Sequence, residues 1–392
     1  MFENIFYYLS LLFKTKYKIK PPKSSEVLIY DHGAEQLNFL NFDKCSIFYN
    51  RGEELNLFIL FKSIFLNGFS NITHNYRITY IKYINPKFII TYRCDNKNFY
   101  ELKKFIKNTK NILIQWGKTI EGHFKYFQSL NNDYDVDEMY LQGEETAKVY
   151  SKYIKGKCFA IGSLSNNRIV FDDNNSIKKN SLVFISQHKP KRPFPEIERI
   201  IIKFLKRYCL KKNLTLSIST RVLASDKKNK KHYEAILGQS DWNYFPREDL
   251  GALGDTAHYR KVLSSEYIVS IDSTLGYEAL SRKKKVVFFP LGSYSKEWCK
   301  KNYVTNLKTK TYWIPEKFGY PLNLNQEGEF WTSEHDEKKM EEKLNYLISI
   351  DENSWDKLLK DIGLEKIIKF NPYNEVLIKN LKKIGVPLKK DY

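Results

Sequence analysis

The sequence has few cysteines, and none of them belongs to a short paired motif. The five cysteines among 392 residues are widely spaced and include no C-x-x-C pair: Cys45, Cys94, Cys158, Cys209 and Cys299. An odd, scattered set argues against a disulfide framework and against a zinc site. We therefore expect free thiols in a reducing cytoplasm.

The sequence also lacks an apolar run long enough to span a bilayer. The N-terminal stretch MFENIFYYLSLLF is too short, carries Glu3 ahead of its apolar part and has no small-residue cleavage site, so we expect neither a span nor a signal peptide. Lysines follow it at positions 14, 16, 18 and 20. The segment 1–24 either rests on an anionic membrane surface or packs as a helix on its own domain.

Acidic residues are fewer than basic ones, 45 against 65, which gives a net charge of +20. Such a charge favours anionic partners: nucleotide sugars, phospholipid headgroups, acidic glycans or nucleic acid. The richness in Lys, Asn, Ile and Tyr is typical of an AT-rich genome, which weakens charge as a functional signal. Because the sequence has no recognition motif and no dense basic helix, we expect no nucleic-acid partner.

The remaining composition is that of a folded protein with two domains. Hydrophobic residues make up 42% and aromatic residues 15% of the chain, which excludes a disordered chain. Strand and helix patterns alternate, which indicates α/β domains with parallel, doubly wound sheets. We expect domains at 25–163 and 181–350, joined by an Asn-, Asp- and Ser-rich linker at 164–180. Helices in 351–392 then cross back to the first domain.

The most informative stretch is YIVSIDSTLGYEALSRKKKVVFFP, Tyr267–Pro290. It predicts a strand at 267–271, a turn at Asp272-Ser273-Thr274, a helix at 275–281 and a second strand at 285–289. Backbone N–H groups and the positive helix end meet at such a turn, where an anion is favoured. The turn therefore predicts a phosphate site, although a well-capped helix in an ordinary α/β domain would have the same pattern.

Each residue of this turn has a predicted role. Ser273 and Thr274 supply hydroxyl donors, and Asp272 orients those hydroxyls. Gly276 lets a ligand or a neighbouring backbone approach closely. Glu278, one turn along the helix, is within reach of the sugar hydroxyls of a nucleotide.

Polar residues also follow two other predicted strands of the second domain. Gln187 and His188 follow a strand at 181–186, and Arg221 follows one at 214–219. Since ligands bind at the carboxyl ends of parallel strands, Gln187 and Arg221 are nucleotide-binding candidates. His188 is a candidate catalytic residue that donates a proton to a departing phosphate, although a loop histidine can equally be structural.

A carboxylate base or nucleophile is expected from the first domain. The candidates are Asp95 at a strand end and Glu144 and Glu145 at a helix start, where an acidic residue can also be a simple dipole contact. Asp31 and His32 follow an earlier strand. No Asp-x-Asp has the strand context of a metal-bound sugar nucleotide, since DYDVD at Asp133–Asp137 is expected in a polar loop. We therefore expect no metal and no other cofactor.

Three stretches resemble bacterial surface-carbohydrate glycosyltransferases of the GT-B type, closest to the Kdo transferase families of capsule and lipopolysaccharide synthesis. They are SIDSTLGYEALSRKKKV, GEETAKVYSKYIKGKCFAIGSLSNN, and FIITYRCDNKNFYELKKF followed by ILIQWG. The resemblance implies two Rossmann-like, doubly wound domains facing a cleft, the first for the acceptor and the second for the donor nucleotide. It also implies metal independence and favours Glu145, Glu144 and Asp95 over Asp31.

The function that the resemblance implies is sugar transfer at the cytoplasmic face of the membrane. The donor would be Kdo or a related ulosonic acid in its CMP form, and the acceptor a glycan or glycolipid. One alternative is a CDP-alditol phosphotransferase of teichoic-acid type, which shares the Asp-Ser-(Ser/Thr) turn and would use paired histidines such as His188 and His258. Another is a non-catalytic basic protein that binds glycans or membranes.

Overall fold

The computed structural model describes most of the chain. The described residues are 14–31, 33–50, 53–118, 133–171, 177–187, 194–248, 252–301 and 316–392. Two histidines named above, His32 and His188, lie outside them, as does the whole N-terminal apolar stretch 1–13.

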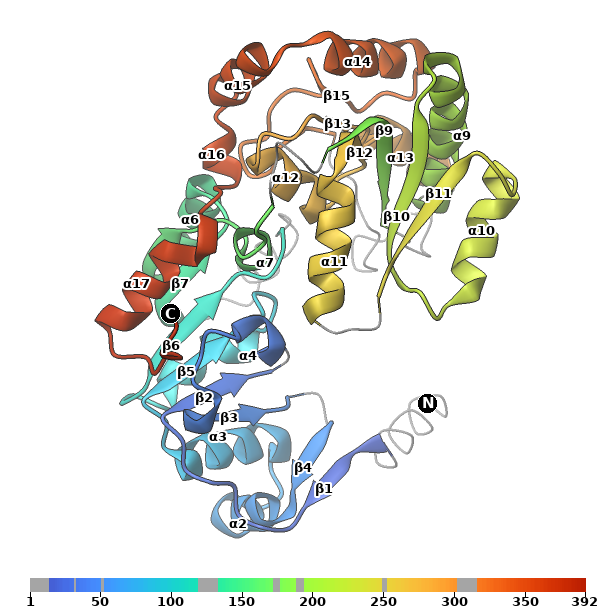
Figure 1. Cartoon of the computed structure of the whole chain (residues 1–392). Helices are drawn as coiled ribbons and strands as arrows, with labels where there is room; N and C mark the ends of the chain where they lie inside the picture. Colours follow the sequence, from blue (N-terminus) through green and yellow to red (C-terminus); the bar gives the residue numbers. More distant parts are fainter. Residues whose placement is uncertain are drawn as a thin grey trace. The chain divides into compact units, whose positions relative to one another are not determined.

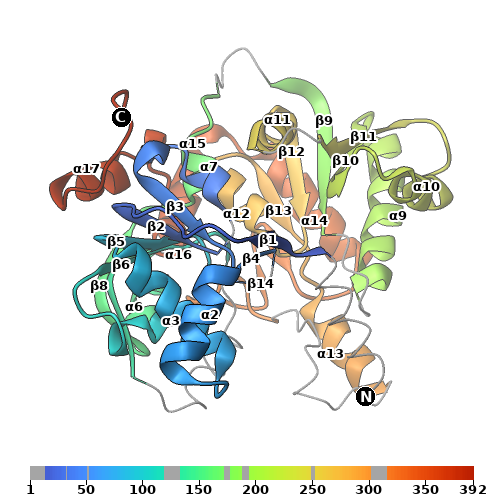
Figure 2. The same cartoon turned by 90° about the horizontal axis from the view of Figure 1, so that it is seen from below.

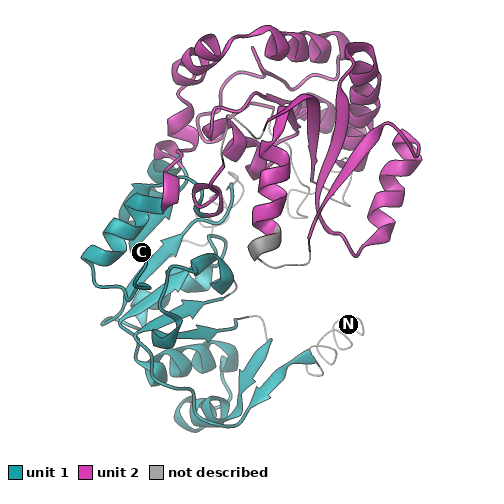
Figure 3. Ribbon diagram, in the orientation of Figure 1, with its two compact units in different colours: residues 1–142, 146–164, 374–392 teal, residues 143–145, 165–373 magenta. Residues whose placement is uncertain are grey.

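The chain folds into two compact units, coloured separately in Figure 3. Unit 1 consists of residues 1–142, 146–164 and 374–392, and unit 2 of residues 143–145 and 165–373. These boundaries differ from the expected ones in two places. Part of the expected linker is folded, since Asn166 and Asn167 are buried in the short helix α7 (Leu164–Asn167). The return to unit 1 begins at residue 374, and residues 351–373 stay in unit 2.

The main sheet of unit 1 has six parallel strands in the order β3-β2-β5-β6-β7-β8. Their bounds are Cys45–Phe48 (β3), Val27–Tyr30 (β2), Phe88–Thr91 (β5), Lys110–Ile114 (β6), Tyr134–Leu141 (β7) and Ile154–Ala160 (β8). β2, β5 and β6 are almost entirely buried apolar runs, as expected for a parallel sheet covered on both faces. A separate parallel pair joins β1 (Lys16–Lys18) to β4 (Glu54–Asn56).

Helices and short helical turns cover the sheet of unit 1. They are η1 (Ala34–Leu37), η2 (Phe42–Lys44), α2 (Leu57–Asn67), α3 (Ile72–Ile84), α4 (Lys97–Tyr100), η3 (Leu102–Lys104), α6 (Glu144–Ser151) and α17 (Glu375–Lys383). Leu377, Ile378 and Leu381 of α17 belong to the same hydrophobic core as Val27 and Ile90 of the central strands. The last helix therefore completes unit 1 although it is far away in sequence.

The sheet of unit 2 has seven strands in the order β11-β10-β9-β12-β13-β15-β14, all parallel except the last pair. Their bounds are Trp242–Arg247 (β11), Thr215–Leu223 (β10), Lys178–Ser186 (β9), Ser265–Ser270 (β12), Val286–Phe288 (β13), Trp331–Thr332 (β15) and Glu327–Gly328 (β14). Figure 1 shows β9, β10 and β12 side by side.

Nine further helical segments of unit 2 are described besides α7. They are α9 (Phe194–Lys212), α10 (Lys227–Leu237), α11 (Ala252–Leu263), α12 (Thr274–Ser281), α13 (Gly292–Lys301), α14 (Glu337–Ser349), α15 (Glu352–Asp361), α16 (Leu364–Ile367) and η4 (Pro372–Asn374). A large core joins α9 to the central strands through residues such as Ile201 and Phe184. Among the described residues, no helix is both long and apolar enough to cross a bilayer.

Tyr244 and Phe245 lie in β11. Asp255 lies inside α11 and pairs with Arg247 at 2.8 Å. One local expectation is wrong. DYDVD is not a loop: it leads into and forms the start of β7, where Asp133 and Asp137 pair with lysines at 2.9 and 2.6 Å.

Candidate functional site

The sheet of unit 2 reverses its direction of growth between β9 and β12. From β9 the chain proceeds to β10 and then to β11 on one side, and it then returns to place β12 on the other side of β9 (Figure 1). Ligands of doubly wound sheets bind at such a switch point, outside the carboxyl ends of the strands. The residues that follow β9 and β12 there are Gln187 and Ile271–Thr274.

Two hydrogen bonds of Ser273 hold the turn after β12. The Ser273 N–H donates to Ser270 Oγ at 3.1 Å, and Ser273 Oγ accepts from the Gly276 N–H at 3.1 Å. Of the three residues of the turn predicted at Asp272-Ser273-Thr274, Ser273 is thus the N-cap of α12, which begins at Thr274. The start of α12 is also the positive end of the helix dipole, so the turn favours an anion.

Gly276 packs against side chains, where the sequence predicted the close approach of a ligand or a neighbouring backbone. A Cβ at this position would lie 2.7 Å from Ser270 Oγ, 2.8 Å from Ser270 Cβ and 3.0 Å from a ring carbon of Phe288. The glycine therefore allows α12 to pack closely against β12 and β13. The close neighbour that the glycine admits is the side chain of Ser270, and the role of Gly276 in ligand binding stays a prediction.

Asp272 and Glu278 are both held by tyrosines. Asp272 Oδ1 accepts from the Tyr277 hydroxyl at 2.9 Å, and the role of this carboxylate in orienting the Ser273 and Thr274 hydroxyls stays a prediction. Glu278 is 1% exposed, and its Oε2 accepts from the Tyr259 hydroxyl at 2.6 Å. In this structure the Glu278 carboxylate is covered, and its contact with a sugar hydroxyl stays a prediction.

Gln187 lies at the switch point above a buried polar network. Glu198 Oε1 accepts from the Gln187 N–H at 2.7 Å and from the Ser186 hydroxyl at 2.8 Å, and Ser186 Oγ lies 2.6 Å from the Tyr233 hydroxyl. Among the described residues, the side-chain oxygen of Gln187 is buried without a hydrogen-bond partner. A buried acceptor of this kind is explained by a ligand or water.

Sequence reasoning missed Glu198. The available signal was its place on the buried face of α9, between Phe194, Ile197 and Ile201. An acidic residue inside an apolar stripe requires hydrogen-bond partners. The partners of Glu198 are Ser186 and Gln187 at the carboxyl end of β9. Arg221, by contrast, is exposed in the last part of β10, beside the register pair Thr220–Ser186.

His258 is buried in α11 next to the end of β10. Its Nε2 lies 3.1 Å from Ser219 Oγ, and burial lowers its pKa to about 4. The imidazole is therefore neutral near pH 7. Its supposed partner in a phosphotransferase, His188, lies outside the described residues.

In unit 1 the switch point lies between β2 and β5, and the residue that follows β2 is Asp31. Asp31 is 1% exposed, has a positive φ of 75°, and accepts from Asn96 Nδ2 at 3.3 Å. Strained, buried polar residues gather at functional sites, so the position favours Asp31 more than the sequence did. Asp95 is exposed in the loop after β5.

Glu144 and Glu145 open α6 and belong to unit 2. Glu144 Oε1 pairs with Lys369 Nζ at 2.7 Å, and the Glu144 side chain is half exposed. The backbone of Ile367 lies so close to Gly143 that a Cβ there would meet its carbonyl oxygen at 2.2 Å. The start of α6 is thus held by an ion pair to Lys369 and by close packing on Ile367. The catalytic role of Glu144 and Glu145 stays a prediction.

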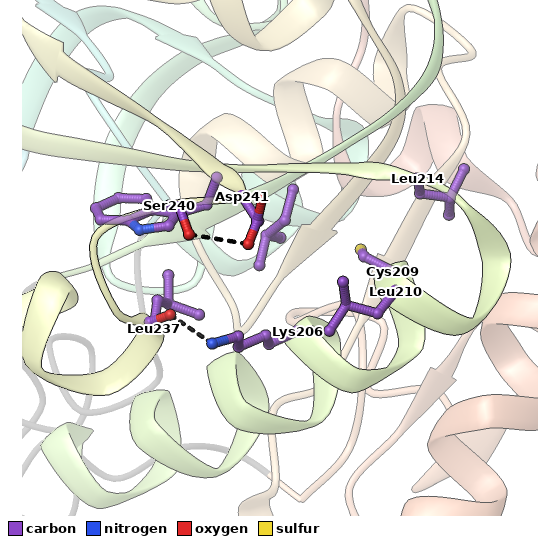
Figure 4. A pocket seen from close by; sticks show the side chains of 9 residues that line it. Lys206, Cys209, Leu210, Leu214, Leu237, Ser240 and Asp241 are labelled. Atoms are coloured by element: carbon purple, nitrogen blue, oxygen red, sulfur yellow. Dashed lines mark hydrogen bonds between the residues drawn. The ribbon is translucent and has the colours of Figure 1, made fainter.

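A small pocket lies at the opposite, amino-terminal edge of the sheet of unit 2. Figure 4 shows it between the end of α9 and the starts of β10 and β11; Lys206 Nζ donates across it to the Leu237 carbonyl at 2.5 Å. Its water-accessible volume of about 20 Å³ holds a water molecule or two. It is too small for a nucleotide sugar. Within the described ranges, no three His, Cys, Asp or Glu side chains gather as a metal would require.

Comparison with known proteins gives one family and a shared fold. Residues 112–385 match the family Lept_O_ant_chp1, described as "putative O-antigen biosynthesis protein". No curated protein sequence matches the chain.

Two solved structures share the fold over almost the whole chain. MnaA of Staphylococcus aureus, in a co-structure with UDP, covers 92% of this chain and 96% of its own, with a TM-score of 0.51 and 14% identity. A "putative UDP-N-acetylglucosamine 2-epimerase" of Listeria monocytogenes covers the same shares, with a TM-score of 0.51 and 10% identity. At these identities the similarity shows the fold, which is GT-B, with two Rossmann-like units.

Proposed function

The chain belongs to this O-antigen biosynthesis family, since the match covers well over half of its 392 residues, and we propose on that premise that it is a glycosyltransferase that uses a nucleotide sugar. The GT-B fold supports the proposal, because two Rossmann-like units suit one nucleotide and one acceptor. The acceptor would be a glycan or glycolipid of the bacterial surface.

The turn at the switch point of unit 2 is the main structural support for a nucleotide-binding function. It combines the start of α12, the Ser273 hydroxyl and the unpartnered oxygen of Gln187 at the edge where β9 and β12 meet. We propose that the donor phosphate binds the first amides of α12, Ser273 and Thr274, with Arg221 as the cation. Asp272, Gly276 and Glu278 would shape this site from inside the fold.

Two donors are in competition. The CMP form of Kdo, or of a related ulosonic acid, remains a prediction from the resemblance of the segment around Ser273. A UDP-sugar is supported by the fold neighbours, since the MnaA structure contains UDP and the Listeria protein is named for UDP-N-acetylglucosamine. The midpoint of thermal unfolding, measured with CMP, CDP, UDP, GDP and their sugar forms, distinguishes the two donors. A ligand at 100 times its Kd adds about 2.7 kcal/mol to the free energy of unfolding and so raises the midpoint.

A matched pair of cap variants tests the phosphate site. Ser273→Ala and Asp336→Ala each remove an N-cap in unit 2, and each should cost ~1 kcal/mol of folding free energy. Only Ser273→Ala should also weaken nucleotide binding, by ~1–3 kcal/mol, the usual value of a charge-assisted hydrogen bond. Isothermal titration with the nucleotide that stabilises the wild type is the measurement. Equal affinities in both folded variants would contradict the assignment.

The catalytic group is proposed among four carboxylates and one histidine: Asp95, Glu144, Glu145, Asp31 and His188. Asp31 joins the first three because it lies at the switch point of unit 1. The amide variants Asp→Asn and Glu→Gln remove the charge and retain the shape, so the variant of the true base should bind nucleotide normally and lose at least about a hundredfold in kcat. Normal turnover in all four amide variants would exclude every carboxylate proposed.

A second candidate function is epimerisation of a UDP-sugar. It is favoured by the two neighbours, since MnaA carries UDP, the other is named as an epimerase, and both match over 92% of the chain. An epimerase needs no acceptor. Proton NMR of UDP-N-acetylglucosamine incubated with the protein alone distinguishes the two: a new epimer would support this candidate, and an unchanged spectrum would support the transferase.

A further inference from the structure

Helix α2 of unit 1 is apolar on both of its faces. Its sequence LFILFKSIFLN contains three polar residues, Lys62, Ser63 and Asn67. The inward face carries Ile59 and Ser63, which are 0% exposed, and packs on α3. A surface helix normally has a polar outer face, so an apolar one indicates that something else covers it.

The outer α2 face consists of five large side chains on α2 and the turn after it. Their exposed fractions are 37% for Phe58, 67% for Phe61, 89% for Phe65, 60% for Leu66 and 79% for Phe69. Phe58, Phe61 and Phe65 follow at intervals of three and four residues, the spacing of one helical stripe, and Phe69 lies in the turn after the helix. Exposed phenylalanines gathered in one stripe and the adjoining turn form an apolar patch of the kind that marks an interaction site.

A lysine-rich segment contacts α2, and one of its lysines, Lys18, is paired with Glu54 of β4 at 2.8 Å. β1 contributes Lys16 and Lys18, Lys14 and Lys20 flank β1, and Lys62 lies on α2 itself. The segments 14–20 and 57–75 contain no Asp or Glu. β1 pairs with β4, both strands contact α2, and Figures 1 and 2 show the three elements together in unit 1.

We propose that the outer α2 face docks unit 1 onto an anionic membrane surface. Phenylalanine and leucine side chains enter the boundary between headgroups and acyl chains, while the lysines contact the phosphates of anionic lipids. The charge complementarity selects this partner, since an apolar face beside the lysine-rich segment 14–20 matches a bilayer of negative headgroups, although Lys18 is paired with Glu54. The proposal rests on α2 and β1 and is independent of the donor and of the reaction.

Vesicle sedimentation of the full-length protein tests the proposal. Vesicles of phosphatidylcholine with 30% phosphatidylglycerol should bind the wild type, and binding should fall when NaCl rises from 50 to 500 mM, because salt screens the lysines. The double variant Phe65→Ser/Phe69→Ser should lower the partition coefficient at least about tenfold. These side chains are 89% and 79% exposed, so the thermal midpoint should not change.

Two matched variants complete the design. Val170→Ser/Leu210→Ser removes two exposed apolar side chains of unit 2, 58% and 64% exposed, and should leave vesicle binding unchanged. Lys14→Gln/Lys16→Gln/Lys20→Gln should weaken binding to the anionic vesicles about tenfold and have little effect with phosphatidylcholine alone.

Three results would overturn the proposal. One is absence of wild-type binding to the anionic vesicles, and another is equal binding by the wild type and Phe65→Ser/Phe69→Ser. The third is self-association of the wild type in analytical ultracentrifugation, lost in Phe65→Ser/Phe69→Ser, without vesicle binding. That result would assign the outer α2 face to a second copy of the chain.

Discussion

Ser273 uses one hydroxyl group for two tasks. Its oxygen accepts from the Gly276 N–H at 3.1 Å and so caps the start of α12. Because a hydroxyl is donor as well as acceptor, the same group can donate to a phosphate oxygen. Structural and binding roles therefore coincide in this residue, which is why its test requires a second cap variant as reference.

The pKa of His258 predicts a pH-dependent stability. In the unfolded chain its pKa is 6.5, and in the folded protein burial lowers it to about 4. Between these values the unfolded state binds more protons, so the free energy of unfolding falls as pH decreases, by ~1.4 kcal/mol per pH unit and ~3 kcal/mol in total. Above pH 6.5 this contribution is constant.

Urea unfolding of the wild type and of His258→Gln from pH 7.5 to 4 measures the effect. The variant lacks the titrating group, so its stability should decrease less over this window. The cost of losing the Ser219 contact should be the same at every pH. Parallel curves for the two proteins would exclude His258 as the source.

At the scale of elements, α17 shows how a distant segment completes a unit. Leu377 and Leu381 are 0% exposed in the core of unit 1, whereas Val376 on the same helix is 40% exposed. The amphipathic pattern of the helix is visible in the sequence, but the surface that it covers is not. Burial of these leucines makes α17 part of the folding unit.

We expect Leu381→Ala to destabilise unit 1 by ~2–5 kcal/mol, the usual cost of truncating a buried leucine. Hydrogen exchange in β2, β5 and β6 should accelerate, while exchange in β9 and β12 should stay unchanged because α17 belongs to the other unit. Val376→Ala is the control and should have little effect. Faster exchange confined to unit 2 would contradict the assignment of α17.

At the scale of the whole molecule, each unit has a doubly wound sheet and its own switch point. Two units with separate cores need not unfold as one, so a single unfolding free energy applies only where probes of both units coincide. The positive groups proposed for the phosphate are a helix end and an arginine. The absence of a resident metal stays a prediction.

We therefore predict that metal removal leaves the nucleotide complex intact. Binding of the stabilising nucleotide should be unchanged in 5 mM EDTA, to within about a factor of two, because the dipole of α12 and Arg221 supply the charge. Titration with and without EDTA, followed by addition of excess Mg²⁺ or Mn²⁺, measures this. A tenfold loss of affinity that Mn²⁺ restores would show that the site requires a metal.

The sequence alone determined the strand–turn–helix around Ser273 and the α/β class, because both depend on local signals: a buried β-branched run, a capping residue and a 3.6-residue period. It also indicated the Lys-rich segment 14–20 that contains β1. It could not determine that Gly276 packs on Ser270, that Glu198 supports β9, or that α17 completes unit 1. These contacts join residues by tertiary packing, and only strand order in the folded sheet decided which strand ends meet at a switch point.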